Sequence, residues 1–299
     1  MSIECFDRAL PHGITLSCRA TGSAALAQKV LLLHGFPEGA FIWDDVMQRL
    51  SGRAQCVAPN LRGYERSSAP ADVEAYRAKH LVTDIAALID LVGAPIDLLV
   101  AHDWGGAVAW TLAAQRPQLI KRLLIINSPH PATFLRELRA SPAQQAASAY
   151  MNFLCRPDAA ALLADSDFKR LWPFFTQMGG AAWLNDTLRE QYRNLWRQGL
   201  EGPLNYYRAS PLKPATSPDD PIHQLELPRP LVSVTVPTTV VWGDADVALP
   251  PSLLDGLGEF VSPLVVHRIA GASHWIVHEQ PALIAATIEQ MLKPPRTVP

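Results

Sequence analysis

The chain has 299 residues, of which 48% are hydrophobic and 18% are charged, and its formal net charge is −2. These values are ordinary for a globular protein that forms one large domain, or a core with a second lobe. With so small a net charge and no run of basic residues, nothing favours binding to nucleic acid or to an anionic membrane surface. No charged N-terminal segment precedes an apolar one, and no apolar run approaches roughly 20 residues, so we expect neither a signal peptide nor a membrane-spanning helix.

The four cysteines, Cys5, Cys18, Cys56 and Cys155, have neither a metal-ligand spacing nor a CxxC pattern. We expect them to be buried free thiols in a reducing compartment, which predicts a cytoplasmic protein.

Short apolar runs predict strands through the first part of the chain. Two candidates near the N-terminus, residues 3–8 and 14–21, are separated by a Pro-His-Gly turn. Later runs are apolar throughout, as expected for central parallel strands, and they cover residues 29–33, 55–59, 95–100 and 121–127. Residues 78–92 place Leu81, Ile85, Leu88 and Ile89 on one helical face, and residues 105–115 predict a second helix.

From about residue 131 to 228 the pattern indicates helices alone, and residues 203–237 are rich in proline, which suits a loop that returns to the core. Strands resume at 238–243 and 264–269, a helix follows at 282–292, and we expect the tail 293–299 to fray. Strands that alternate with helices imply a mostly parallel sheet covered on both faces. We therefore predict an α/β core of residues 1–130 and 236–299, split by an all-helical cap of residues 131–235.

An aspartate occupies the turn between the predicted strand 95–100 and the helix 105–115. Ala101 and Gly105, both small, flank Asp103, as required where a strained turn joins a strand to a helix that crosses it closely. This strand–turn–helix order is typical of the turn that presents a nucleophile, usually serine. Asp103 would otherwise be a surface aspartate at a strand end. A carboxylate presented there suits attack on a saturated carbon rather than on an ester.

The partners of a nucleophile in such a fold follow later strands, in the order acid and then base. Asp246 is the predicted acid, with Asp244 as the alternative that we expect to cap the turn or face solvent. His274 is the predicted base, with His278 one helical turn later as the alternative. The two histidines have a spacing that metal sites use, but no Glu follows His274 and no third ligand is placed, so we expect no metal.

Several segments together resemble the epoxide hydrolases of the α/β-hydrolase superfamily, in the right order over nearly the whole core. They are His34-Gly35-Phe36-Pro37-Glu38, Arg62-Gly63-Tyr64, His102-Asp103-Trp104-Gly105-Gly106, Trp242-Gly243-Asp244-Ala245-Asp246 and Ser273-His274-Trp275. The resemblance implies the α/β-hydrolase fold, with Asp103 as nucleophile, His274 as base and Asp246 as the acid that orients it. It also implies an oxyanion hole formed by the backbone N–H groups of Phe36 and Trp104.

In the cap, the resemblance implies two tyrosines that donate hydrogen bonds to the epoxide oxygen. Tyr207, in Leu204-Asn205-Tyr206-Tyr207-Arg208, matches the second of them, and Tyr150 is the best match for the first. Tyr206 and Tyr207 would otherwise be core aromatics, which helical bundles bury routinely. The chain departs from the family's pattern at Asn60, Glu65 and Ala101. These departures concern the geometry of the turns and leave the chemistry unchanged.

Other histidines and cap aromatics have simpler explanations. We expect His34 and His102 to brace loops by hydrogen bonds, and His130 to order the entry to the cap. The remaining candidates for the substrate cleft are equally explained by packing: Met151, Phe153, Phe174, Phe175, Trp183 and Trp196.

The resemblance implies hydrolysis of epoxides to vicinal diols through an alkyl ester of Asp103, without a cofactor. The expected partners are a small apolar epoxide and water, and the oligomeric state stays open, a homodimer included. One alternative is a haloalkane or haloacid dehalogenase, which uses the same Asp-His-Asp arrangement but needs no paired tyrosines. Another is a binding protein that retains the pocket without turnover, since a fold alone does not establish function.

Overall fold

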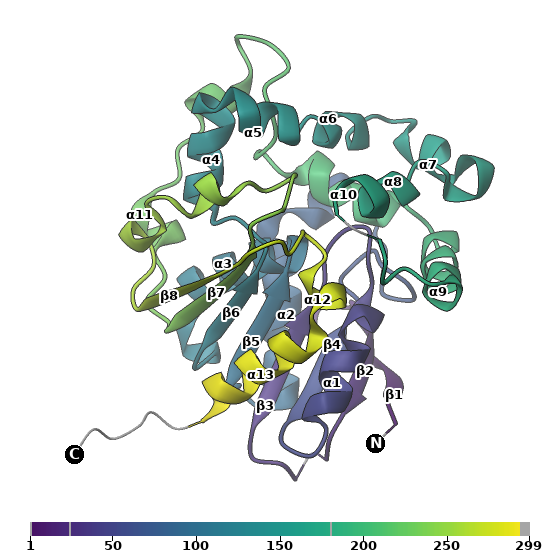
Figure 1. The fold of residues 1–299 in the computed structure, drawn as a ribbon, viewed down its shortest axis with the longest axis vertical. Helices are drawn as coiled ribbons and strands as arrows, with labels where there is room; N and C mark the ends of the chain where they lie inside the picture. The colour runs from purple at the N-terminus through teal and green to yellow at the C-terminus, as the bar shows by residue number, and fades with distance from the viewer. Residues whose placement is uncertain (1, 24, 180, 294–299) are drawn as a thin grey trace.

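The computed structural model describes residues 2–23, 25–179 and 181–293, so the predicted fraying of the tail lies outside the described residues from 294 onward. Within the described residues, eight strands form one sheet in the order β1-β2-β4-β3-β5-β6-β7-β8 (Figure 1). Strand β2 pairs antiparallel with β1 and with β4, and every other neighbouring pair is parallel. The strands are β1 (Glu4–Ala9), β2 (Thr15–Thr21), β3 (Lys29–Leu33), β4 (Gln55–Pro59), β5 (Leu98–His102), β6 (Leu123–Ile126), β7 (Thr238–Gly243) and β8 (Leu264–Ile269).

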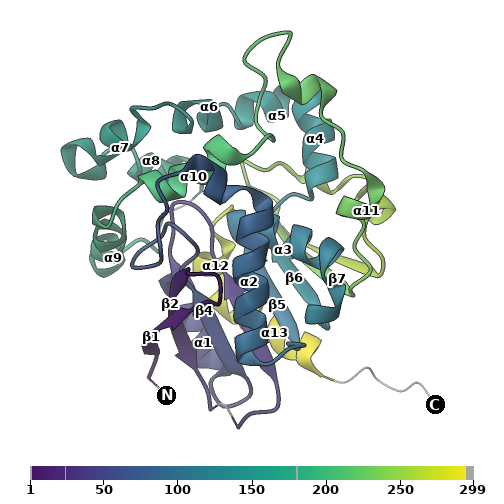
Figure 2. The same ribbon diagram turned by 180° about the vertical axis from the view of Figure 1, so that it is seen from behind.

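Helices cover both faces of this sheet, as Figures 1 and 2 show from opposite sides. The core helices are α1 (Asp44–Leu50), α2 (Ala78–Val92), α3 (Trp104–Gln115), α12 (Ile276–Glu279) and α13 (Pro281–Leu292). On β5, Leu98 and Val100 pack into the cluster with α1 and α13, whereas Leu99 and Ala101 pack into the cluster with α2 and α3. Because both faces are covered, the strand is apolar at every position.

The helices between β6 and β7 are α4 (Pro131–Ala140), α5 (Pro142–Ala147), α6 (Tyr150–Leu154), α7 (Ala159–Phe168), α8 (Trp172–Gln177), α9 (Asp186–Arg197), α10 (Glu201–Ala209) and α11 (Arg229–Val232). Helices α4 to α10 lie beyond the end of the sheet at which β5 and β7 terminate, whereas the last helix between β6 and β7, α11, lies beside α3 (Figures 1 and 2). This arrangement is the α/β-hydrolase fold with an inserted helical cap, and it confirms the predicted fold class.

The structure corrects three details of the sequence interpretation. The predicted loop 203–237 begins as helix, because α10 continues to Ala209. Pro203 is the third residue of α10 and is tolerated there, since the first N–H groups of a helix have no partner within it. The strand predicted at 95–100 begins only at Leu98, because Asp97 lies in a turn where its carboxylate accepts a hydrogen bond from the Lys29 N–H at 2.8 Å. The strand predicted at 121–127 is likewise shorter and spans Leu123–Ile126.

The cysteines are free, but the expectation that all are buried is wrong. Cys18 and Cys56 are buried, and burial raises the pKa of both thiols to about 12. Cys5 is exposed because it lies on β1, the edge strand, and Cys155 is partly exposed at the end of α6. Along the described residues, no helix has the length and apolarity that a membrane span requires.

Candidate active site

Asp103 lies in a strained turn between β5 and α3. Its backbone has φ 50° and ψ −123°, a conformation that costs free energy for any residue with a Cβ atom and that persists only where the surroundings enforce it. Ser128 enforces it from the next strand by donating its hydroxyl to the Asp103 carbonyl at 2.7 Å. Two glycines leave room for the turn: a Cβ on Gly35 would overlap the Asp103 carboxylate, and a Cβ on Gly105 would lie 2.6 Å from the His34 carbonyl oxygen.

His274 lies between two carboxylates at the same edge of the sheet. Its Nε2 atom is 3.7 Å from Asp103 Oδ2, and its Nδ1 atom is 2.7 Å from Asp246 Oδ2. Asp103 follows β5, Asp246 follows β7 and His274 follows β8, so the carboxyl ends of parallel strands bring them together. The three side chains that the sequence singled out therefore lie in one line, in which His274 is hydrogen-bonded to Asp246 and lies beside Asp103.

Asp246 is buried and held on both of its oxygens. The N–H groups of Ala248 and Leu249 donate to Oδ1, both at 2.9 Å, and Asn127 Nδ2 donates to Oδ2 at 2.6 Å. The alternative acid, Asp244, instead accepts a hydrogen bond from Arg268 Nε at 2.8 Å near the surface. The geometry thus separates the two aspartates as the sequence pattern predicts.

The charge on His274 is governed by its neighbours. Burial lowers the pKa of His274, but the Asp246 carboxylate, assisted by Asp103 and Glu38, outweighs burial and raises the pKa to about 9. At neutral pH the imidazole is therefore protonated in the free protein.

This pKa predicts how stability depends on pH. The folded-state value of about 9 lies above the reference value of 6.5, so the interaction stabilises the fold fully below about pH 6.5 and is lost as pH rises through 9. We expect the free energy of unfolding to fall over this window by at most about 3 kcal/mol. Denaturant titrations at several pH values measure it, and His274→Gln should flatten the profile. A wild-type profile as flat as that of the variant would contradict the assignment.

One backbone amide contacts the Asp103 carboxylate, and another begins the helix that follows Asp103. The Phe36 N–H donates to Asp103 Oδ1 at 2.7 Å. Trp104 is the first residue of α3, so its N–H is among the helix-start amides that have no partner within the helix. These are the two donors that the sequence predicts for an oxyanion hole.

Tyr150 and Tyr207 project from the cap helices α6 and α10 into the cavity that Asp103 lines. Their ring centroids lie 6.3 Å apart, and Tyr207 packs edge-on against Trp104 with centroids 5.0 Å apart. Burial, with the charge of Asp103 as a further cause, raises the pKa of both phenols well above their ordinary value. Both are therefore neutral hydrogen-bond donors at physiological pH. Tyr206 differs, because its hydroxyl donates to the Arg62 carbonyl at 2.9 Å and so ties the cap to the core.

The main cavity has a volume of about 280 Å³ and extends from Asp103 and Trp104 between the core and the cap. Of the cap residues proposed for the cleft, Met151 lines this cavity. The others are engaged in packing. Phe174 contacts Phe36, and Phe175 is fully buried. The Trp183 ring stacks on the His278 ring, with their centroids 4.1 Å apart.

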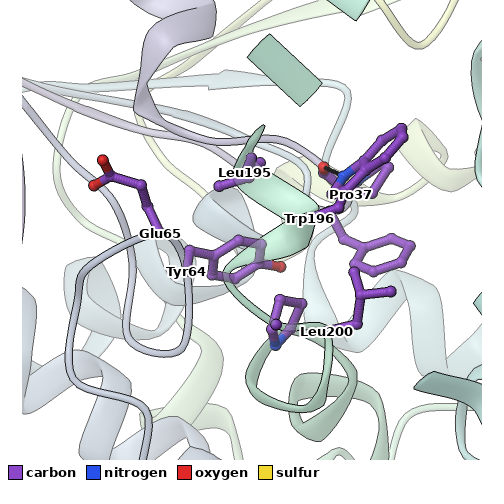
Figure 3. A pocket seen from close by; sticks show the side chains of 9 residues that line it. Pro37, Tyr64, Glu65, Leu195, Trp196 and Leu200 are labelled. Atoms are coloured by element: carbon purple, nitrogen blue, oxygen red, sulfur yellow. Dashed lines mark hydrogen bonds between the residues drawn. The ribbon is translucent and has the colours of Figure 1, made fainter. Parts of the chain in front are cut away.

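A second cavity, of about 10 Å³, lies behind Phe36 (Figure 3). Tyr64 of the core lines it together with Leu195, Trp196 and Leu200 of the cap, all labelled in Figure 3. The Trp196 indole donates to the Pro37 carbonyl at 2.7 Å and closes this region. Such a volume is close to that of a single water molecule, so the substrate must occupy the larger cavity.

The sequence interpretation missed a buried hydrogen-bond network behind the nucleophile. Glu38 Oε1 accepts hydrogen bonds from the Tyr192 hydroxyl at 2.7 Å and from His278 Nε2 at 2.8 Å, and Oε2 lies 3.3 Å from His102 Nδ1. Burial raises the pKa of Glu38, but the nearby His102 and the hydrogen-bonded His278 outweigh it and hold the pKa well below its usual range. His278 is therefore engaged by Glu38, and His274 is the histidine beside Asp103.

Three further histidines, His34, His102 and His130, lie within hydrogen-bond distance of backbone atoms in neighbouring segments. His34 donates from Nδ1 to the Gly35 carbonyl at 3.0 Å and accepts from the Leu61 N–H at 3.0 Å, and burial lowers its pKa to about 4. His102 Nε2 lies 2.9 Å from the His274 carbonyl. His130 begins α4 and contacts the Val232 carbonyl at 2.8 Å, which joins the two ends of the cap.

Two further residues support the site without having been predicted, Asn127 and Ser128. Both follow β6, the strand between those that carry Asp103 and Asp246. Their position at the carboxyl end of a central strand is the sequence signal that could have identified them.

The departures at Asn60 and Glu65 compensate each other, because Asn60 Nδ2 donates to Glu65 Oε2 at 2.9 Å and so holds the turn.

Comparison with known proteins agrees with the fold. The family model described as alpha/beta hydrolase fold matches residues 29–281. Epoxide hydrolase 4 of Mus musculus is 30% identical over 307 residues, covering 98% of this chain and 80% of the mouse protein. The AB hydrolase superfamily protein YfhM of Bacillus subtilis (strain 168) is 32% identical, with 94% of this chain and 96% of that protein covered.

Solved structures give the same relationship. A structure from work on epoxide hydrolases in metagenomes from hot environments superposes with a TM-score of 0.88 at 35% identity, covering 98% of this chain and 99% of that one. A Bacillus megaterium epoxide hydrolase in complex with an inhibitor superposes with a TM-score of 0.86 at 31% identity, covering 96% and 99%. The chain belongs to the α/β-hydrolase superfamily and, within it, to the epoxide hydrolase family.

Proposed function

We propose that this protein is an epoxide hydrolase that converts epoxides to vicinal diols through an ester formed on Asp103. One observation carries the proposal: a carboxylate backed by His274 and Asp246 lines the same cavity as two neutral phenols, Tyr150 and Tyr207. The names of its relatives, several of them epoxide hydrolases, support the same substrate class.

In the first half of the reaction, an Asp103 oxygen attacks an epoxide carbon from the side opposite the breaking C–O bond. The leaving alkoxide is strongly basic and needs a proton donor. Tyr150 and Tyr207 bind the epoxide oxygen, and one of them transfers its hydroxyl proton to it. The products of this step are an alkyl ester on Asp103 and one ionised tyrosine.

In the second half, water hydrolyses the ester. Esterification removes the negative charge of Asp103, one of the charges that keep the pKa of His274 high, so the imidazole gives up its proton more readily. His274 then accepts a proton from the attacking water, and Asp246 stabilises the imidazolium. The N–H groups of Phe36 and Trp104 bind the oxyanion, a contribution of about 10²–10³ in rate per donor. The proton that His274 gave up restores the tyrosine, and the proton released as Asp103 returns to its carboxylate form passes to the oxygen of the departing diol.

Intact-protein mass spectrometry of His274→Gln tests this sequence of steps. The variant keeps the nucleophile but lacks the base, so an adduct with the whole mass of the epoxide should accumulate during incubation with a panel of epoxides. The matched control is the double variant with Asp103→Asn, which should form no adduct. An adduct from haloalkanes alone would make the protein a dehalogenase, and no adduct from either panel would contradict the proposed ester.

The dehalogenase alternative uses the same triad, and the Trp104 indole lines the cavity where a halide would leave. A halide needs no proton, however, so the pair of phenols would have no role.

We also propose residues 131–235 as the cap and 1–130 with 236–299 as the core, because β6 ends at Ile126, β7 begins at Thr238 and α4 to α11 lie between them.

A further inference from the structure

The main cavity continues from Asp103 along one face of α3. Trp104, Ala107, Thr111 and Gln115 follow one another at helical spacing and all line it. At about 1.5 Å per residue, the path from Trp104 to Gln115 measures roughly 16 Å. Figure 2 shows α3 with α2 and α11 on either side of it. We call this extension of the cavity the α3 groove. Its opposite wall comes from the segment after α10 and from α11: Ala209, Pro211, Leu212, Leu227 and Leu231.

The walls of the α3 groove carry no cation. Among the described residues that line the whole cavity there is no lysine, arginine or histidine, and Asp103 is the single carboxylate. The hydroxyls along the groove are engaged locally: Thr111 Oγ1 donates to the Ala107 carbonyl at 2.9 Å, and Ser210 Oγ accepts from the Leu212 N–H at 3.1 Å. Apart from the Gln115 side chain and the Tyr76 hydroxyl, which has no hydrogen-bond partner, the surface that remains for a ligand along the groove is mainly apolar.

The far end of the α3 groove meets solvent. Gln115 is exposed, and Leu231 is 50% exposed although it lies in the wall of an apolar cavity. A ligand that starts at Asp103 and follows α3 can therefore extend to the surface. Each methylene that it places along the wall covers apolar surface and adds to the binding free energy.

Resting on the proposed function, we propose that the α3 groove binds the substituent of the epoxide, and that the preferred substrates carry one long, uncharged alkyl chain. A carboxylate on that chain would lose its hydration without meeting a cation, which disfavours binding. Short epoxides bind weakly because they leave the groove empty. The chain length and the charge of the substituent, rather than the epoxide ring itself, thus determine selectivity.

Steady-state kinetics with two terminal epoxides, butene oxide and decene oxide, tests the groove. Wild-type kcat/KM should be at least about tenfold higher for decene oxide, since single methylenes in apolar pockets already change it by about that factor. Thr111→Trp fills the groove halfway along and should remove this preference by raising KM for decene oxide. Thr111→Val is the matched control and should keep the chain-length preference, because it preserves the volume of the groove and the Thr111 hydroxyl bonds to its own helix.

A second variant tests whether the lack of a cation in the α3 groove disfavours substrates that carry a carboxylate. The wild type should prefer the methyl ester of epoxyundecanoic acid to the free acid. Leu231→Lys, at a half-exposed position that tolerates a charge, should raise kcat/KM for the free acid relative to the ester by at least about fivefold.

Three outcomes separate the two proposals. Turnover of no epoxide by the wild type would contradict the proposed function. Equal kcat/KM values for butene oxide and decene oxide would overturn the proposed role of the α3 groove and leave the proposed function intact. The same conclusion would follow if Thr111→Trp lost turnover of both epoxides and Leu231→Lys showed no gain in kcat/KM for the free acid. The expected chain-length preference, its loss in Thr111→Trp and the acid response of Leu231→Lys would support both.

Discussion

Replacing Asp103 by Asn is expected to lower kcat by at least about 10⁴-fold, the scale of loss when an activated nucleophile is removed. The amide is neutral and a poor nucleophile, whereas its size and its tolerance of positive φ match those of Asp103, whose φ is 50°. The loss should therefore fall on chemistry rather than on folding, and an unchanged urea m-value together with a retained far-ultraviolet circular dichroism spectrum checks this.

A single-turnover experiment tests the same residue from another direction. When the wild-type protein is in excess and the water is enriched in the heavy oxygen isotope, the first diol should contain unlabelled oxygen from Asp103. The label should appear instead in the Asp103 carboxylate, where peptide mass analysis locates it. Direct attack of water on the epoxide would label the diol at once, which would contradict the ester.

Removing both cap phenols is the second change with a large expected effect. The double variant Tyr150→Phe, Tyr207→Phe should lower the rate of ring opening by about 10³–10⁴-fold, because general acid catalysis contributes on that scale and the alkoxide then leaves without a proton. Each single variant should lose less, about 10²-fold or below, since the remaining phenol still reaches the same oxygen. Rapid-quench measurement of ester formation gives these rates.

The two half-reactions distinguish this role from packing. Hydrolysis of the ester, measured after rapid formation with excess substrate, should change little in either single variant, because the phenols act on the first step. Tyr206→Phe is the matched control: its hydroxyl bonds to the Arg62 carbonyl, so it should lower stability and leave ring opening unchanged. Equal slowing of both steps in the Tyr150 and Tyr207 variants would contradict a role as proton donors.

The fold class and the family were predictable because their signals are local. A strand, a turn with small residues and a helix occupy a single short segment around Asp103, and Asp246 and His274 each follow a strand whose apolar run is recognisable. The structure brings these three side chains together with Tyr150, Tyr207 and the Phe36 N–H, while their catalytic roles remain predictions. The loop assigned to 203–237 was wrong over its first residues, 203–209, because proline content was weighed without the position of Pro203 in the first turn of α10.

The network around Glu38 was beyond such reasoning. Glu38, Tyr192 and His278 lie far apart along the chain, and each belongs to a different element, so no spacing relates them. Glu38 was quoted only as part of a motif, and His278 was weighed only as a rival base or a metal ligand. The contacts among these residues depend on how the cap packs against the core. An analysis of sequence periodicity gives no information about such tertiary packing.

The packing of α9 against the core allows the cap to support the backbone of the active site. Two α9 side chains donate hydrogen bonds to the loop that carries the Phe36 amide. Tyr192 donates to the Glu38 carboxylate, and Trp196 donates to the Pro37 carbonyl. That loop cannot shift without breaking buried hydrogen bonds to another lobe. The position of an amide against Asp103 is consequently set by residues more than 150 places away in the chain, so the two lobes have to be engineered, exchanged or evolved as a matched pair.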